Sequence, residues 1–162
     1  MSHRADALAD RIEQGARALG SIVEGLSDDE WRTVVPHEGR TVGVLVHHVA
    51  SVYPLEIDAA KAVAGGQPIV GLTTDVVAHM NAAHASENHA VDKSATLALL
   101  RANSKAAADR VRTFSDAELD SAATVSLNAD APLTAQFVIE DHAVRHSYHH
   151  LASICAALGP QS

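Results

Sequence analysis

Apolar residues recur at every third or fourth position over four long stretches of this chain. In the first stretch Leu8, Ile12 and Leu19 follow this spacing, with charged residues between them. An α-helix has 3.6 residues per turn, so such residues lie on one face and form an amphipathic helix. The pattern predicts long helices over residues 4–25, 41–64, 94–114 and 132–158, and a shorter helical run over 73–85.

Residues that begin and end helices stand at the edges of these stretches. Thr41 is a suitable N-cap, Pro132 fits the first turn of the last helix, and Gly159 follows its end together with Pro160. Two Ser-x-x-Glu capping boxes, at Ser27 and Ser115, predict short additional helices.

The helices account for most of the chain, so we predict an all-α fold. Pro54 predicts a kink in the second long helix. Residues 122–130 contain β-branched residues and an Asn-Ala-Asp run, which indicate a loop. No repeat or low-complexity linker divides the sequence. We therefore expect one domain over residues 1–162, built as a four-helix bundle.

Charge and cysteine content exclude several classes of protein. Twelve basic and twenty acidic residues give a formal net charge of −8, which disfavours binding to nucleic acid or to anionic membranes. Cys155 is the single cysteine, so no intrachain disulfide can form, and we interpret it as a small core residue. No stretch is apolar enough to span a bilayer, and the charged beginning is unlike a signal peptide. We expect a cytoplasmic protein.

Histidine is the unusual residue, with eleven in the chain. Four of them, His142, His146, His149 and His150, lie on one face of the last predicted helix when it is drawn as a regular α-helix. The opposite face is also largely apolar, which predicts either the most buried helix of the bundle or an interface between two copies of the chain.

The second long helix supplies a partner for these side chains. His48 shares its helical face with apolar residues and is predicted to point inward, whereas His47 lies about 100° away around the helix. One imidazole from this helix and an i, i+4 pair from the last helix can bind a divalent metal and leave one coordination position open. An antiparallel arrangement favours His48, His146 and His150, with the pair His142 and His146 as the alternative.

The same segments resemble the two motifs of the DinB-like superfamily of helical bundles. Residues 39–50 are similar to its first motif, a glycine and apolar stretch that ends in histidine, and residues 146–154 to its second, His-x-x-x-His followed by small and apolar residues. Arg40 departs from the tryptophan common in relatives, and His47, His142 and His149 are extra histidines that could replace or support a ligand.

The resemblance implies an up-down-down-up bundle with a long crossover between the second and third long helices. It also implies a divalent metal held by His48, His146 and His150. The superfamily includes mycothiol-dependent maleylpyruvate isomerase and related transferases that use a low-molecular-weight thiol. Zinc and nickel both suit imidazole ligands.

These observations favour a metal-dependent enzyme that acts on a small molecule, in the form of a thiol-dependent transferase or isomerase. Glu56 is a candidate general base, with a surface ion pair as its simpler interpretation. A metal-dependent hydrolase would use the same residues. The alternative is a dimeric bundle that binds a metal or a small ligand without catalysis, and we expect a homodimer in either case.

Overall fold

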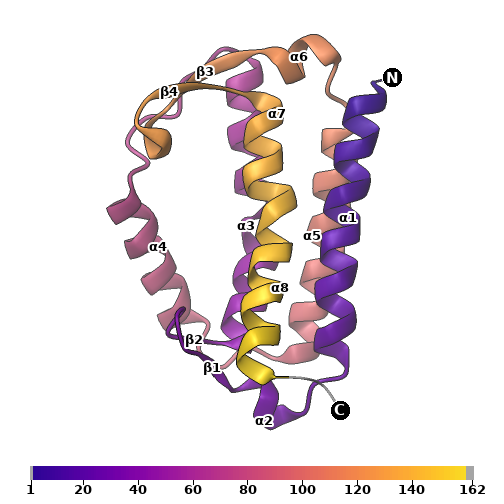
Figure 1. The fold of residues 1–162 in the computed structure, drawn as a ribbon, viewed down its shortest axis with the longest axis vertical. Helices are drawn as coiled ribbons and strands as arrows, with labels where there is room; N and C mark the ends of the chain where they lie inside the picture. The colour runs from indigo at the N-terminus through magenta and orange to yellow at the C-terminus, as the bar shows by residue number, and fades with distance from the viewer. Residues whose placement is uncertain (1, 160–162) are drawn as a thin grey trace.

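The computed structural model describes residues 2–159, in which four long helices form a bundle (Figure 1). The first three are α1 (His3–Glu24), α3 (Val42–Ala64) and α5 (Lys93–Val111). The fourth is a continuous helix made of α7 (Ala135–Val138), a π-helical segment η2 (Ile139–Val144) and α8 (Arg145–Leu158). The predicted all-α bundle is confirmed. Pro160 lies outside the described residues.

Shorter elements connect the long helices. They are the helices α2 (Asp28–Trp31), α4 (Thr74–Glu87), α6 (Asp116–Asp120) and η1 (Ser126–Asn128), and the strands β1 (Val34–Val35), β2 (Arg40–Thr41), β3 (Ala122–Val125) and β4 (Ala131–Thr134). Strand β1 pairs with β2, and β3 pairs with β4, both antiparallel. The predicted capping boxes at Ser27 and Ser115 both form, as does the Thr41 cap.

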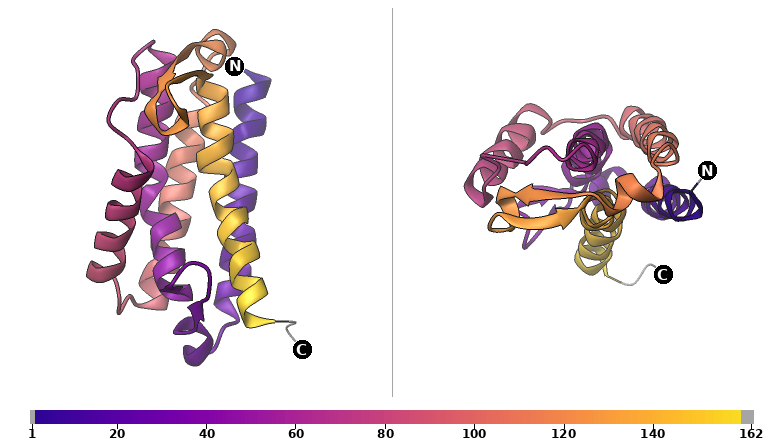
Figure 2. Two further views of the ribbon diagram at one scale, coloured as in Figure 1. Left: turned by 60° about the vertical axis from the view of Figure 1, so that its left-hand side comes forward. Right: turned by 90° about the horizontal axis from the view of Figure 1, so that it is seen from above.

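The four long helices surround one apolar core. Helix α5 packs against both α1 and α3, and the α7–α8 helix contacts α1 and α3 on the other side (Figure 2). Helix α3 is the most deeply enclosed element, with twelve buried residues. Helix α4 instead stands outside the bundle, has no buried residue, and packs chiefly against α3 (Figure 1).

The first hairpin is held close to the N-terminal end of α3. A Cβ atom at Gly43 would lie 2.6 Å from the Trp31 indole ring, so only glycine permits this approach. The same indole donates a hydrogen bond from Nε1 to the Val91 carbonyl at 3.1 Å. This packing places the loop between β1 and β2 beside the histidines of α3.

Helix α3 continues through Pro54, which has no N–H to donate to the carbonyl of Ala50 one turn earlier. Asn103 of α5 supplies the missing donor, because its side-chain nitrogen lies 2.8 Å from the Ala50 oxygen. A buried carbonyl in α3 is thus satisfied from a neighbouring helix.

Two expectations about the last third of the chain are wrong. Residues 122–130 are not simply a loop, because residues 122–125 form β3, and Pro132 lies in β4 opposite Thr124 rather than in the last helix. That helix begins at Ala135, with Thr134 as its N-cap. The turn between the strands places Ala129 and Asp130 at positive φ, which lets the chain reverse direction.

Cys155 is exposed, not a core residue. Each outer helix of a four-helix bundle buries one face, and in α8 the buried face contains Ser147, His150 and Ile154. The opposite face, which includes Cys155, is therefore left outside the core. The last helix is accordingly not the most buried helix of the bundle.

Candidate metal centre

Three imidazoles from two helices meet inside the bundle. His48 lies near the start of α3, and His146 and His150 lie one turn apart in α8. His48 Nε2 is 3.2 Å from His146 Nε2, and one ring nitrogen from each of the three residues lies within 4.8 Å of the others. The i, i+4 pair that faces His48 is therefore His146 with His150, as the antiparallel argument favours, and not His142 with His146.

The register of the two helices is fixed beside the triad. Tyr53 of α3 is fully buried and its hydroxyl shares a hydrogen bond of 2.6 Å with the Ser147 hydroxyl of α8. Ser147 directly follows His146, so this contact sets the height of His146 relative to His48. The two buried hydroxyls hydrogen-bond to each other, so neither needs an imidazole as its hydrogen-bond partner.

The spacing of His48 and His146 suits two ligands of one divalent ion. Two ligand nitrogens at about 2.1 Å from zinc, separated by a tetrahedral angle, lie about 3.4 Å apart. The separation of 3.2 Å between His48 Nε2 and His146 Nε2 is close to that value. Three protein nitrogens would occupy three positions and leave the fourth for a small molecule.

Two carboxylates lie behind the imidazoles of α8. Glu56 Oε1 is 2.7 Å from His146 Nδ1, and Glu38 Oε1 is 3.2 Å from His150 Nδ1. The Glu38 contact is too poorly aligned for a good hydrogen bond. A carboxylate that accepts the N–H of one ring nitrogen fixes the tautomer and turns the other nitrogen toward the metal.

Burial keeps the two most enclosed imidazoles neutral, as ligation requires. Burial, with His146 and Arg40 nearby, lowers the pKa of His48 to about 3. Burial and the neighbouring His146 and His48 lower the pKa of His150 to about 2. Both rings are therefore unprotonated near neutral pH, with a lone pair available for a cation.

Sequence reasoning missed Glu38 and the role of Arg40. Glu38 lies in the β1–β2 turn, and Arg40 pairs with it through Nη2 and Oε2 at 2.7 Å. Neither belongs to the helices that contain the histidines, so helical spacing cannot relate them to the site. Glu140 and Asp141, which lie beside the histidines in the sequence, pair with Arg11 and Arg145.

Glu56 is not the surface ion pair that was its simpler interpretation. Its side chain is 10% exposed and is paired with His146. The second oxygen, Oε2, is buried and has no hydrogen-bond partner among the described residues. Glu56 therefore presents one uncommitted oxygen near the triad.

The extra histidines take other positions. His47 is not part of the triad, and its Nδ1 lies 2.9 Å from Nε2 of His84 in α4, whose ring packs edge-on against His48. His142 and His149 line the adjoining cavity. Glu38, His149 and His150 form a second group with metal-ligand spacing, but it shares His150 with the triad and Glu38 already pairs with Arg40. His79 and His89 are exposed.

A cavity of about 460 Å³ opens beside the triad. One side, which we term the apolar wall, consists of residues from α3, α4 and two connecting segments: Val52, Leu55, Ala59, Leu72, Val77, Met80 and Leu127. The facing side, the polar wall, comes from η2 and α8: Asp141, His142, Arg145, His146, His149 and His150. The volume is within the range of small-molecule sites, about 300–1,000 Å³.

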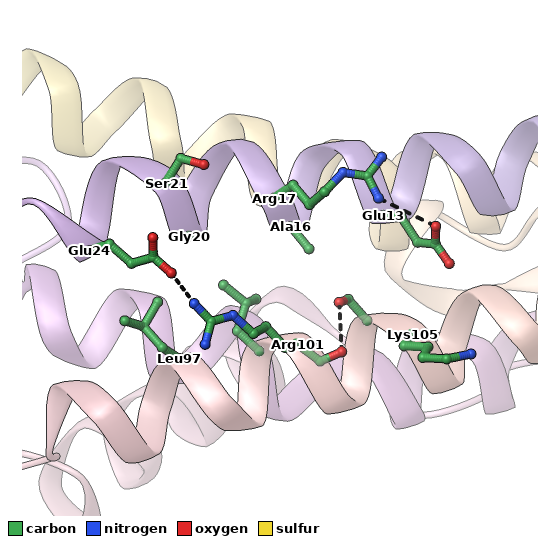
Figure 3. A pocket seen from close by; sticks show the side chains of 11 residues that line it. Glu13, Ala16, Arg17, Gly20, Ser21, Glu24, Leu97, Arg101 and Lys105 are labelled. Carbon is green, nitrogen blue, oxygen red and sulfur yellow. Dashed lines mark hydrogen bonds and ion pairs between the residues drawn. The ribbon is translucent and has the colours of Figure 1, made fainter.

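A second cavity of similar size lies between α1 and α5, and no histidine is among the residues that line it (Figure 3). Its charged side chains are mostly paired with one another, as in the Glu24–Arg101 ion pair and the contact between Glu13 and Arg17. None of its lining residues belongs to a metal-ligating group identified in the described part of the chain. The cavity beside the triad is therefore the better candidate for a functional site, because metal-ligating side chains line it.

Comparison with known proteins agrees with this arrangement. A family model described as the DinB superfamily matches residues 11–154. The chain belongs to the DinB superfamily. No curated protein matches it significantly. Among solved structures, YfiT from Bacillus subtilis aligns with a TM-score of 0.76 at 21% sequence identity, over 97% of this chain and 87% of YfiT.

YfiT is described as a probable metal-dependent hydrolase with an unusual four-helix bundle topology. At this level of identity the similarity shows the shared fold. The histidine cluster of this DinB-superfamily chain points to a divalent-metal site. Between residues 2 and 159, no helix combines the length and apolar character needed to cross a bilayer.

Proposed function

We propose that this DinB-superfamily protein is a metal-dependent enzyme for a small molecule, with a divalent ion held by His48, His146 and His150. The observation that carries the proposal is the convergence of three imidazoles, two of them buried and neutral, at one side of a cavity. Unpaired buried imidazoles would be costly, whereas a shared cation satisfies all three. Zinc and nickel are the proposed ions.

Such an ion, when bound, supplies Lewis acidity and lowers the pKa of a nucleophile at its open coordination position. The protein's own residues do the rest. Glu56 orients His146 through Oε1 and can accept a proton at Oε2, which has no other partner among residues 2–159. The apolar wall limits access of water to the bound molecule.

We propose a transferase or isomerase that uses a low-molecular-weight thiol cosubstrate as the specific form of this activity. The support is the resemblance of residues 39–50 and 146–154 to the motifs of a superfamily that includes such enzymes. A hydrolase is the second candidate. It is favoured by the uncommitted Glu56 Oε2 and by the described activity of YfiT.

Metal content tests the shared part of both candidates. Protein purified without an affinity tag should contain about one zinc or nickel ion per chain, measured by plasma mass spectrometry. His146→Ala should lose the ion. His79→Ala, which changes an exposed histidine on α4, should retain it. An empty wild-type protein that takes up no ion on reconstitution would contradict the proposal.

Activity then separates the candidates. The metal-loaded protein should consume chlorodinitrobenzene in the presence of a thiol, and His48→Ala should abolish the reaction. Hydrolysis of small esters or amides without a thiol would favour the hydrolase. Metal binding without turnover in either assay would favour the non-catalytic binding module.

We also propose that the protein forms a homodimer through the exposed part of the last helix. Phe137 and Tyr148 are 39% and 42% exposed, and such apolar surface favours self-association. Sedimentation equilibrium at micromolar concentration should give twice the 17.0 kDa chain mass. A single 17.0 kDa species would contradict the dimer.

A further inference from the structure

The apolar wall exposes large side chains beside a polar site. Leu55 of α3 and Met80 of α4 are 57% and 50% exposed, although both line the cavity. Val77 lies three residues before Met80, so both side chains share one face of α4. Because α4 buries none of its residues, this face is not used to pack against the core. It is available to contact an apolar ligand.

The α3 side of the wall extends away from the triad. His48, Val52, Leu55 and Ala59 line the cavity at successive steps of four, three and four residues. Such residues form one stripe along a helix, and positions 48 and 59 are separated by about 16 Å along the axis. The apolar surface is thus elongated, with the histidines at one end.

The polar wall favours an anionic group. Arg145 is held by Asp141 through its Nε, at 2.9 Å, and its two Nη atoms have no partner among the described residues. Two of the three carboxylates that line the cavity are paired with arginines, Glu38 with Arg40 and Asp141 with Arg145, and the third, Glu56, contacts His146 through Oε1. A guanidinium with free Nη groups binds carboxylate-like anions well.

We propose that this cavity binds an amphiphilic small molecule, with an anionic head at Arg145 and the histidine triad and an apolar chain along Leu55, Val77 and Met80. The placement of the head beside the triad rests on the proposed function, whereas the placement of the chain does not. The substrate class is therefore a small anion that has a medium-length apolar chain.

Straight-chain carboxylates test this inference. Acetate, butyrate, hexanoate and octanoate would be titrated calorimetrically into metal-free and zinc-loaded protein. The dissociation constant should fall about tenfold or more from butyrate to octanoate in both forms, because each methylene buried in an apolar pocket strengthens binding. Arg145→Met should weaken all four ligands by a similar factor.

Substitutions in the apolar wall test where the apolar chain of the ligand binds. Met80→Gln and Leu55→Asn should each reduce the gain in binding affinity from butyrate to octanoate. Val76→Thr is the matched control, because Val76 is 41% exposed on the same helix but does not line the cavity. It should retain the full gain. Both test positions are exposed, and circular dichroism would verify that the variants are folded.

Equal affinity for all four carboxylates would overturn the inference, as would a full gain from chain length in both Met80→Gln and Leu55→Asn. The measurements on zinc-loaded protein test a separate point, the proposed metal site. Failure of zinc to bind would contradict the proposed function, while the chain-length dependence in metal-free protein would still decide the inference.

Discussion

Glu56 Oε1 lies 2.7 Å from His146 Nδ1, so a carboxylate of α3 holds the imidazole of α8 that faces His48. The contact joins the two helices that provide the triad. The carboxylate also favours the His146 tautomer that is protonated at Nδ1. The lone pair of the ring then lies on Nε2, the nitrogen nearest His48.

Replacing this carboxylate should weaken metal binding without emptying the site. Glu56→Gln removes the negative charge while keeping the size of the side chain, and we expect zinc affinity to fall by about 10–100-fold. Competition with a chelator of known affinity measures the change. Asp58→Asn is the matched control, because Asp58 lies on the same helix but pairs with Arg110 at the surface. Equal affinity in Glu56→Gln and the wild type would contradict the positioning role.

The hydrogen bond between Asn103 and Ala50 should be needed only because Pro54 follows one turn later. Asn103→Ala leaves the Ala50 carbonyl unpaired in the core, and we expect a loss of about 1–3 kcal/mol in the free energy of unfolding. Pro54→Ala restores a backbone donor and should recover much of that loss in the double variant. Urea unfolding of the wild type, the two single variants and the double variant measures these changes. Additive effects of the two substitutions would argue against the coupling.

The contact between His47 and His84 should hold α4 against α3. His84→Ala removes it, and a hydrogen bond contributes about 0.5–1.5 kcal/mol, equivalent to about 2–13-fold faster local opening. Hydrogen exchange of the amides in residues 74–87 should accelerate by that factor. His79→Ala is the control, since the ring of His79 bonds only to the Asp75 carbonyl of its own helix. Unchanged exchange in His84→Ala would show that other contacts hold α4.

The capping box of α6 should give the protein a defined dependence on acid. Hydrogen bonds from the backbone and hydroxyl of Ser115, with Lys61 nearby, lower the pKa of Glu118 to about 2. A group whose pKa is lower when folded stabilises the fold above its ordinary pKa of 4.5, and that stability is lost as pH falls toward 2. The difference in Tm between the wild type and Glu118→Gln should be largest above pH about 5 and shrink in acid.

Thermal melts at several pH values test this expectation for Glu118. Glutamine retains an acceptor for Ser115, so the comparison isolates the charge. A Tm difference that stays constant from neutral pH into acid would mean that the ionised carboxylate is not the stabilising species.

Helical periodicity predicted the parts of the fold that depend on local spacing. The boundaries of α1, α3 and α5 lie within a few residues of those expected, because caps such as Thr41 and the apolar pattern act within one helix. The β3–β4 hairpin was missed because its pairing joins residues such as Thr124 and Pro132 across a turn. Pro132 fits the start of a helix equally well when only its neighbours are considered.

In the candidate site, too, local spacing predicts some residues and not others. His48, His146 and His150 could be grouped from helical phase, since each phase is a property of one helix. Glu38 reaches His150 from a hairpin, and no spacing within α3 or α8 indicates that contact. The π-helical segment at residues 139–144 had no recognisable signal, and it changes the phase of His142 relative to the rest of the helix.

The most direct test is a crystal structure of zinc-reconstituted protein with anomalous data collected on both sides of the zinc edge. Metal binding by the triad predicts one anomalous peak in the bundle, at about 2.1 Å from a ring nitrogen of each of His48, His146 and His150. A fully reconstituted crystal with no peak among these three residues, or with zinc bound only at other side chains, would contradict it.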